Sequence, residues 1–124
     1  MAKSVHDSVL DGAFDILDQG NIMVACSAQP LNRTEAVTTY ALADVAMTVN
    51  TDYTKADGDV SGRKCTVAAK AGVLVDVSGT ANHIAICDAT NVLYVTTCTP
   101  QALTANGSNT VNFPAWDIEI ADPT

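Results

Sequence analysis

Two short apolar runs with the composition of β-strands, at 83–87 and 92–98, constrain the fold of this chain most strongly. They are separated by the polar tetrapeptide DATN, which is typical of the turn that closes a β-hairpin. Pairing of residue 87 with residue 92 places four aliphatic side chains on one face, because side chains alternate along a strand. We expect this core face to carry Ile84, Ile86, Leu93 and Val95. The other face is mixed in polarity and carries His83, Ala85, Cys87, Val92, Tyr94, Thr96 and Cys98.

Further strand-like runs are separated by Gly, Pro and Asn turns, at 22–28, 64–69, 73–77, 110–113 and 115–120. Residues 70–72 are expected to close a hairpin between the second and third of these runs, 53–62 to form a loop, and Pro100 to interrupt pairing. The clearest alternation places Trp116, Ile118 and Ile120 on one face. Residues 31–46 fit neither periodicity, although Asn32 or Thr34 is a suitable cap for a short helical turn.

Residues 5–19 are predicted to form an amphipathic helix that begins after Ser4 and stops at Gly20. Its apolar stripe contains Val5, Val9, Leu10, Ala13, Ile16 and Leu17, and its opposite face is predicted to be a solvated row of Asp7, Asp11, Asp15 and Asp18. The helix serves either as a lid on a sheet or as an arm that docks on a neighbouring subunit. Together these patterns predict a mainly β, antiparallel β-sandwich or jelly-roll-like fold with one N-terminal amphipathic α-helix. We expect a single domain over 1–124, with the sandwich at 22–120.

The composition argues against several classes of function. Hydrophobic residues make up 48% of the chain and charged residues 16%, which favours a compact globule over disorder. The net charge of −8 disfavours binding to nucleic acid or to an anionic membrane. No apolar run approaches the length of a membrane span, and the acidic residues near the start do not fit a secretory signal. We therefore expect a protein made in a cytoplasm.

No motif predicts an enzyme or a cofactor site. The chain lacks the sequence patterns of serine hydrolases, zinc proteases, P-loops and dinucleotide-binding folds, and His6 and His83 stand alone. Asp52, Asp57 and Asp59 share a Gly-containing segment, but they have neither the spacing nor the glutamate of an EF-hand calcium loop. We therefore predict no catalytic residue, no cofactor and no metal ligand, and interpret these acids as solvated.

Four cysteines lie singly in apolar segments and show no C-x-x-C spacing: Cys26, Cys65, Cys87 and Cys98. Three interpretations stay open. They are free buried thiols, disulfides formed within or between subunits in an oxidising medium, or metal-binding or catalytic groups.

Three segments of the chain resemble small structural proteins of tailed-bacteriophage virions. They are HDSVLDGAFDIL leading into CSAQP, then DGDVSGRKCTVAAKAGVLVDVSGTANHIAICD, and then LYVTTCTPQALTANGSNTVNFPAWDIEI. The resemblance implies a virion component assembled in the host cytoplasm, with no catalytic residues. The leading hypothesis is a capsid decoration or cement protein that binds as a trimer to the major capsid protein or other virion proteins.

Such a protein acts by burying apolar surface between subunits. The candidate contacts are Val9, Ala13 and Ile16 on the helix, and the aromatic residues Tyr94 and Trp116. One alternative is a neck-associated or tail-associated virion component. Another is a receptor-binding or glycan-binding β module.

Overall fold

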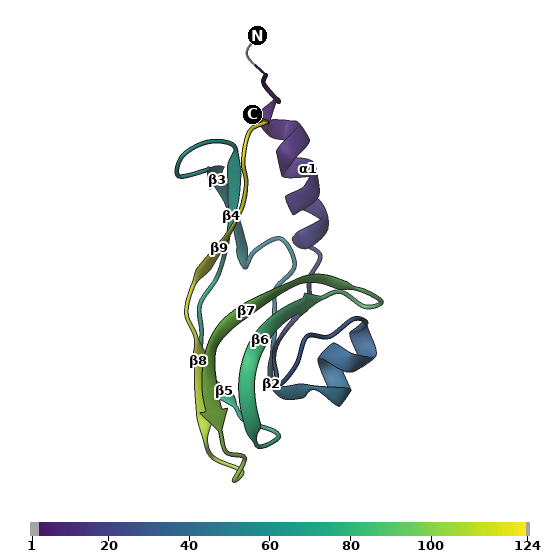
Figure 1. Cartoon of the computed structure of the whole chain (residues 1–124), viewed down its shortest axis with the longest axis vertical. Helices are drawn as coiled ribbons and strands as arrows, with labels where there is room; N and C mark the ends of the chain where they lie inside the picture. Colours follow the sequence, from purple (N-terminus) through teal and green to yellow (C-terminus); the bar gives the residue numbers. More distant parts are fainter. Residues whose placement is uncertain (1–2, 124) are drawn as a thin grey trace.

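The structure, a computed structural model that describes residues 3–123, consists mainly of short antiparallel strands with one α-helix near the N-terminus (Figure 1). The elements in chain order are α1 (Asp7–Leu17), β1 (Ile22–Cys26), the π-helical turn η1 (Glu35–Thr39), β2 (Ala41–Ala46), β3 (Tyr53–Asp57), β4 (Arg63–Val67), β5 (Lys70–Leu74), β6 (Gly79–Cys87), β7 (Val92–Leu103), β8 (Thr110–Phe113) and β9 (Trp116–Ile120). The predicted mainly β composition and the N-terminal helix are confirmed.

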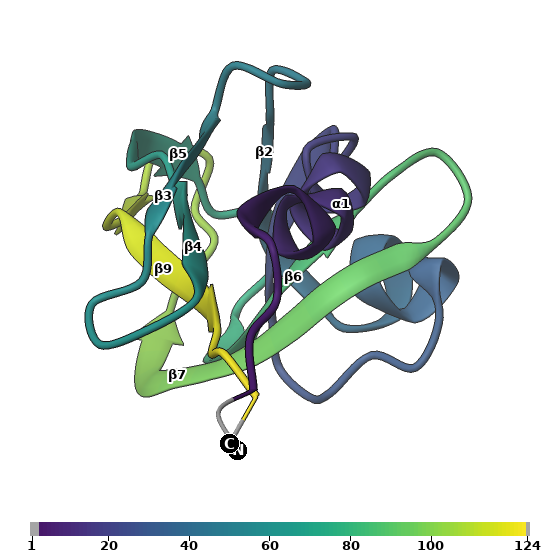
Figure 2. The same ribbon diagram turned by 90° about the horizontal axis from the view of Figure 1, so that it is seen from above.

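The strands pair into three antiparallel sheets. The largest has the order β2-β1-β6-β7, the second β3-β4-β9, and the third β5-β8. A single bridge between Ala43 and Val75 links β2 to the segment that follows β5. Figures 1 and 2 show that α1 lies at the same end of the molecule as the β3-β4-β9 sheet and the two chain ends.

The main core takes side chains from α1 and from all three sheets, which ties these elements into one packed body. Its buried members are Phe14, Leu17, Met23, Ala25, Leu42, Ala43, Met47, Tyr53, Cys65, Val67, Val73, Val75, Ala81, Ile86, Leu103, Phe113 and Ile118. Trp116 and Ile120 pack against it with Ile118, so the face predicted for β9 is confirmed.

A second, smaller core lies on the opposite face of the large sheet, under η1. It contains Val24, Cys26, Ala36, Ala85 and Cys87. The two central strands, β1 and β6, are therefore buried on both faces, which explains the uninterrupted apolar run in β1.

The central hairpin forms with the predicted pairing of Cys87 with Val92, but its faces differ from the prediction. Leu93 is an extra residue that forms a β-bulge, so Ile86 pairs with Tyr94 instead of Leu93. Tyr94 consequently packs against the main core, and Val95 packs against the small core. The prediction placed these two residues on the opposite faces, because one inserted residue reverses the alternation of every residue after it.

The segment 53–62 was predicted as a loop, and this prediction is wrong for its first half. Residues Tyr53 to Asp57 form β3, which pairs with β4 along its full length. β3 lies at the edge of its sheet and is mostly half exposed, so it lacks the apolar alternation that identifies a strand from sequence.

The predicted hairpin across 70–72 is also wrong. β4 pairs with β3 and β9, whereas β5 pairs with β8. The chain passes from one sheet to another between Val67 and Lys70 instead of turning back, and Gly72, with φ of +67°, lies inside β5 at an irregularity of the ladder.

Pro100 interrupts the pairing with β6, as predicted, but it does not end the strand that contains it. β7 continues to Leu103, because the ladder with β6 skips several β7 residues between the pairs Ala81–Gln101 and His83–Thr97. Pro100 falls in that irregular stretch, where a missing backbone donor breaks no regular pair.

The helix is shorter than predicted, and His6 rather than Ser4 is its N-cap. The His6 Nδ1 atom accepts a hydrogen bond from Ser8 N at 3.2 Å. The helix leads to Gly20, where a Cβ atom would lie 2.4 Å from Ile86 Cγ2 and 2.6 Å from the Tyr53 hydroxyl. Only glycine allows the chain to pass this close to β6.

Candidate interaction site

Helix α1 carries more apolar surface than the body of the protein covers. Phe14 and Leu17 point into the core and are buried, whereas Val9 and Ile16 are 65% and 64% exposed and Ala13 is exposed beside them. The exposed three are spaced i, i+4 and i+7, so they form one ridge along the helix. The apolar stripe predicted for α1 is therefore divided into a buried half and an exposed half.

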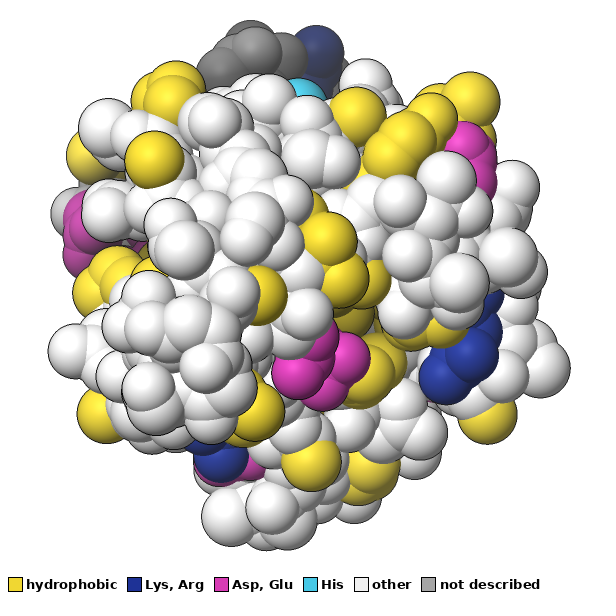
Figure 3. All heavy atoms as spheres, turned by 90° about the horizontal axis from the view of Figure 1, so that it is seen from below, with side chains coloured by type: hydrophobic (Ala, Val, Ile, Leu, Met, Phe, Trp, Pro, Cys, Tyr) yellow, Lys and Arg dark blue, Asp and Glu magenta, His cyan; other side chains and the backbone are white. Residues whose placement is uncertain are grey.

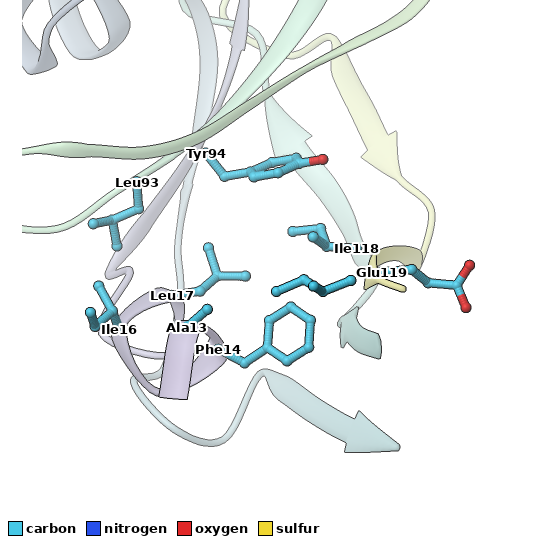
Figure 4. Close-up of a pocket in the computed structure, with 9 residues that line it drawn as sticks. Ala13, Phe14, Ile16, Leu17, Leu93, Tyr94, Ile118 and Glu119 are labelled. Atoms are coloured by element: carbon cyan, nitrogen blue, oxygen red, sulfur yellow. The ribbon is translucent and has the colours of Figure 1, made fainter. Parts of the chain in front are cut away.

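The exposed ridge borders a pocket of about 260 Å³ between α1, β7 and β9 (Figure 4). Its lining is almost entirely apolar: Ala13, Phe14, Ile16, Leu17, Leu93, Tyr94, Ile118, Glu119 and Ile120. In Figure 4 the carboxylate of Glu119 points away from the other lining side chains. We call the ridge and this pocket together the α1 groove.

Ion pairs fix α1 to the β3-β4-β9 sheet. Arg63 Nε and Nη2 bind the two carboxylate oxygens of Asp11 at 2.9 and 3.2 Å, in the bidentate geometry that guanidinium favours. Lys55 bonds to Asp15 and, at 2.9 Å, to Asp18. The aspartate row was predicted to be solvated. This prediction is wrong for Asp18, which is buried, and for Asp11, which is largely covered, because two cations on β3 and β4 lie opposite the helix, whereas Asp15 is ion-paired but remains exposed.

The pKa shifts of these groups agree with the pairing. The Arg63 guanidinium, which hydrogen-bonds the carboxylate of Asp11, holds the pKa of Asp11 below its ordinary value. The pKa of Lys55 is raised, first by its hydrogen bond to Asp15 and then by that to Asp18. Both groups are charged at neutral pH, and the shifts favour those charged forms further, in agreement with the ion pairs that hold α1 against the sheet.

Of the five predicted contact residues, the structure brings Ala13, Ile16 and Tyr94 into one pocket, with Val9 on the adjoining ridge. Trp116 is half buried and does not line the pocket. Its ring lies 5.9 Å from that of Tyr94, centroid to centroid, and its buried Nε1 has no hydrogen-bond partner among the described residues. Trp116 therefore lies next to Tyr94, a lining residue of the pocket, without lining the pocket itself.

Sequence reasoning missed three residues that complete the groove: Leu93, Ile118 and Ile120. The alternation in β9 correctly identified Ile118 and Ile120 as inward-facing, but only the tertiary structure brings them into one pocket with Ile16. Nothing in the sequence indicated that Leu93 is a bulge residue.

The four cysteines are free thiols in this structure, and they differ in access. Cys26, Cys65 and Cys87 are fully buried, whereas Cys98 on β7 is partly exposed. Burial raises the pKa of Cys26 to about 12 and that of Cys65 to about 11. Of the four, only Cys98 can reach a partner chain without unfolding.

The acidic residues once considered for calcium each pair with a different cation. Asp57 lies 2.9 Å from Arg63, Asp59 lies 2.8 Å from Lys64, and the third acid, Asp52, lies 2.9 Å from a lysine on β5. All three are ion-paired, but the side chains of Asp57 and Asp59 remain exposed to solvent, as predicted, whereas that of Asp52 is largely covered. Within residues 3–123 no group of three or more His, Cys, Asp or Glu side chains is arranged to hold a metal ion.

His83 bonds to its neighbour Asn82, with 2.6 Å between its Nδ1 and the amide oxygen, and thus has a local partner. His6 has the capping role described above. The side-chain hydrogen-bond partners of the two histidines are thus Ser8 and Asn82, both close to them in the sequence.

A second cavity of about 310 Å³ lies between the large sheet and β8, and Ile84, Cys98, Leu103 and Phe113 are among its lining residues. Figure 3, which views the molecule from below, shows a surface with few charged side chains and apolar atoms exposed in the hollows between white polar and backbone atoms. Exposed apolar surface is thus not confined to the end that carries α1.

Among the described residues, no helix has the length and apolar character needed to cross a membrane. Comparison of the chain with protein-family models, with curated proteins and with solved structures finds no match.

Proposed function

We propose that this protein is a structural component of a tailed-bacteriophage virion, and specifically a capsid decoration or cement protein that acts by adhesion. The observation that carries the proposal is the α1 groove, an apolar surface held rigid by ion pairs and left open to solvent. Val9 and Ile16 are both about two thirds exposed. Their exposed aliphatic side chains add nothing to the stability of an isolated chain, which favours a role in contact with a partner.

The groove has the features of a protein-binding surface. It combines a concave apolar centre, where Tyr94 is the aromatic residue, with a ridge that a partner surface can enclose. Burial of apolar area contributes about 25 cal/mol per Å², from which the costs of association are subtracted. A protein that binds many equivalent sites on a capsid needs such a binding surface and does not need catalytic residues.

The architecture inferred with this function is a β-sandwich or jelly-roll-like body. Support comes from the main core, which takes buried residues from the large sheet, such as Met23, and from the smaller sheets, such as Val67 and Phe113. Sheets that share one core in this way resemble the layers of a sandwich.

The test is to purify particles of a phage that encodes this chain and to measure its copies per particle by quantitative mass spectrometry. Many copies, with density for the chain on the head in electron microscopy, are expected of a decoration protein. A few copies at the neck or tail would replace the decoration assignment with the neck or tail alternative. Absence from particles would overturn the proposal, and specific signals on a glycan array would favour the glycan-binding alternative.

A pair of matched variants tests the groove itself. Ile16→Asp introduces a charge into the α1 groove, and Val60→Asp introduces the same charge at a residue that is 98% exposed in the β3–β4 loop. Both variants should fold, because both positions are exposed. We expect Ile16→Asp to be lost from particles and Val60→Asp to be retained. Equal retention of the two would show that the groove is not the adhesive surface.

A further inference from the structure

Negative charge is concentrated at the end of the molecule that carries the α1 groove. This end, which we call the α1 end, comprises α1, the β3-β4-β9 sheet and the segments that adjoin them (Figures 1 and 2). Figure 3, which views the molecule from the opposite end, shows few charged side chains. The α1 end holds nine acidic and four basic residues: Asp7, Asp11, Asp15, Asp18, Asp57, Asp59, Asp117, Glu119 and Asp122, against Lys3, Lys55, Arg63 and Lys64.

Three of these basic residues are each shared by two carboxylates, so they do not neutralise the acids around them. Arg63, for example, lies 2.9 Å from both Asp11 and Asp57. Each such group of one cation and two carboxylates keeps an uncompensated negative charge. The three groups are Lys55 with Asp15 and Asp18, Arg63 with Asp11 and Asp57, and Lys64 with Asp59 and Asp117. The ion pairs that hold α1 in place therefore leave charge that a partner can neutralise.

Acidic side chains adjoin the α1 groove on both α1 and β9. Asp15, which precedes the groove residue Ile16, has a side chain that is 64% exposed. Glu119 on β9 lines the pocket, and its carboxylate points away from the apolar lining (Figure 4). None of the nine described residues that line the pocket is a lysine or an arginine. A partner thus meets an apolar pocket with carboxylates beside it.

We propose that the partner of the α1 groove is a positively charged segment of another protein, with an aliphatic or aromatic side chain in the pocket and lysine or arginine side chains on the carboxylates beside it. Charge complementarity selects this occupant. A second copy of the chain, a nucleic acid and an anionic membrane all carry the same sign of charge as the α1 end, which repels them. The inference rests on the adhesive role proposed for the groove, and it adds the chemistry of the partner.

The first test uses the purified chain and two synthetic helical peptides that share their leucine positions. One peptide has lysine at its polar positions, and the other has glutamate. The lysine peptide should shift the amide NMR signals of Ile16, Tyr94 and Ile120, and the glutamate peptide should not. Because salt screens exposed charges, the affinity for the lysine peptide should fall at least about tenfold between roughly 0.01 and 1 M NaCl. Equal binding of the two peptides, or no shifts at the groove, would overturn the inference.

Two variants at the groove separate binding in the pocket from attraction to a negatively charged protein in general. Ile16→Asp makes the chain more negative but places a charge on the apolar ridge, so it should weaken binding of the lysine peptide at least about tenfold. Glu119→Gln removes one charge beside the pocket and keeps an oxygen that can accept from Asp59 N, and it should weaken binding severalfold. Tighter binding by Ile16→Asp would show that charge alone attracts the peptide, and the inference would fail.

Asp76→Asn is the matched control for Glu119→Gln. Asp76 is an exposed acid in the segment after β5, and its N–H donates to Leu42 O on β2, away from the α1 end. The control removes the same single charge from the chain, and the affinity for the lysine peptide should stay unchanged. Equal losses for Asp76→Asn and Glu119→Gln would contradict a partner bound beside Glu119.

Carbodiimide cross-linking of purified phage particles distinguishes this inference from the virion role, because the reagent joins a carboxylate to a lysine amine that lies beside it. We expect acids of the α1 end to be joined to lysines of a different virion protein. If particles carry the chain but no acid of the α1 end is joined to another protein, the partner inference is overturned and the virion role stands. If the chain is absent from particles, the virion role is overturned and the peptide measurements decide the partner inference.

Discussion

Arg63 on β4 binds Asp11 on α1 through two hydrogen bonds, of 2.9 and 3.2 Å, and joins residues that are 52 positions apart in the sequence. The same guanidinium also bonds to Asp57 at 2.9 Å. Through this contact the β3-β4-β9 sheet fixes the position of the helix, and with it the α1 groove.

The pairing predicts a pH-dependent loss of stability on replacement of Arg63. The pKa of Asp11 is lower in the folded protein than the ordinary value of 3.8. Its contribution to stability is therefore fully present above pH 3.8 and is lost as the pH falls through the lower, folded value. Arg63→Met should be less stable than the wild type at neutral pH, and the difference should shrink on acidification below pH 3.8. Urea unfolding at several pH values measures this.

Arg33→Met is the control for that experiment. Arg33 donates from Nε to the main-chain carbonyl of Asp88 at 2.7 Å, and a carbonyl does not titrate. The effect of Arg33→Met should therefore not change over the same pH interval. A pH-independent effect of Arg63→Met would contradict the assigned role of Asp11.

Tyr53→Phe should destabilise the fold by roughly 1–3 kcal/mol, because it leaves a buried carbonyl without a partner. The Tyr53 hydroxyl donates to Gly20 O at 2.9 Å, and the side chain is buried. Tyr40 carries no side-chain hydrogen bond within the described residues, so Tyr40→Phe should change stability little. Equal free energies of unfolding for the two variants would show that the bond to Gly20 contributes nothing.

Replacement of isoleucine by alanine should reduce the free energy of unfolding strongly at Ile86 and hardly at all at Ile16. Ile86 is fully buried in the main core, and Ile86→Ala should cost about 2–5 kcal/mol. Ile16 is 64% exposed in the α1 groove, and Ile16→Ala should change the free energy of unfolding of the isolated chain by no more than about 0.5 kcal/mol. Denaturant unfolding compares them. A large cost at Ile16 would mean that the groove is closed within a single chain.

Thiol labelling should detect one accessible cysteine in the folded chain and all four after unfolding. The accessible residue is Cys98, and burial raises its pKa as well, so its labelling should be slower than that of a fully exposed cysteine. Mass spectrometry after alkylation identifies the site. If subunits cross-link on oxidation, Cys98→Ser should abolish the cross-linked band, and persistence of that band would contradict the assigned burial of the other three.

The sequence by itself determined the strand-rich character of the chain, the N-terminal helix, the Cys87–Val92 hairpin pairing and the inward face of β9. Each of these depends on local periodicity or turn chemistry, which neighbouring residues encode. Only the tertiary structure decided that Leu93 is a bulge that exchanges the faces of Tyr94 and Val95, and that β4 and β5 belong to different sheets. It alone also showed that Asp11 meets Arg63, and that Ile16 and Ile118 line the same open groove. These features depend on contacts between residues far apart in the chain, and a local pattern carries no information about which distant partner will cover it.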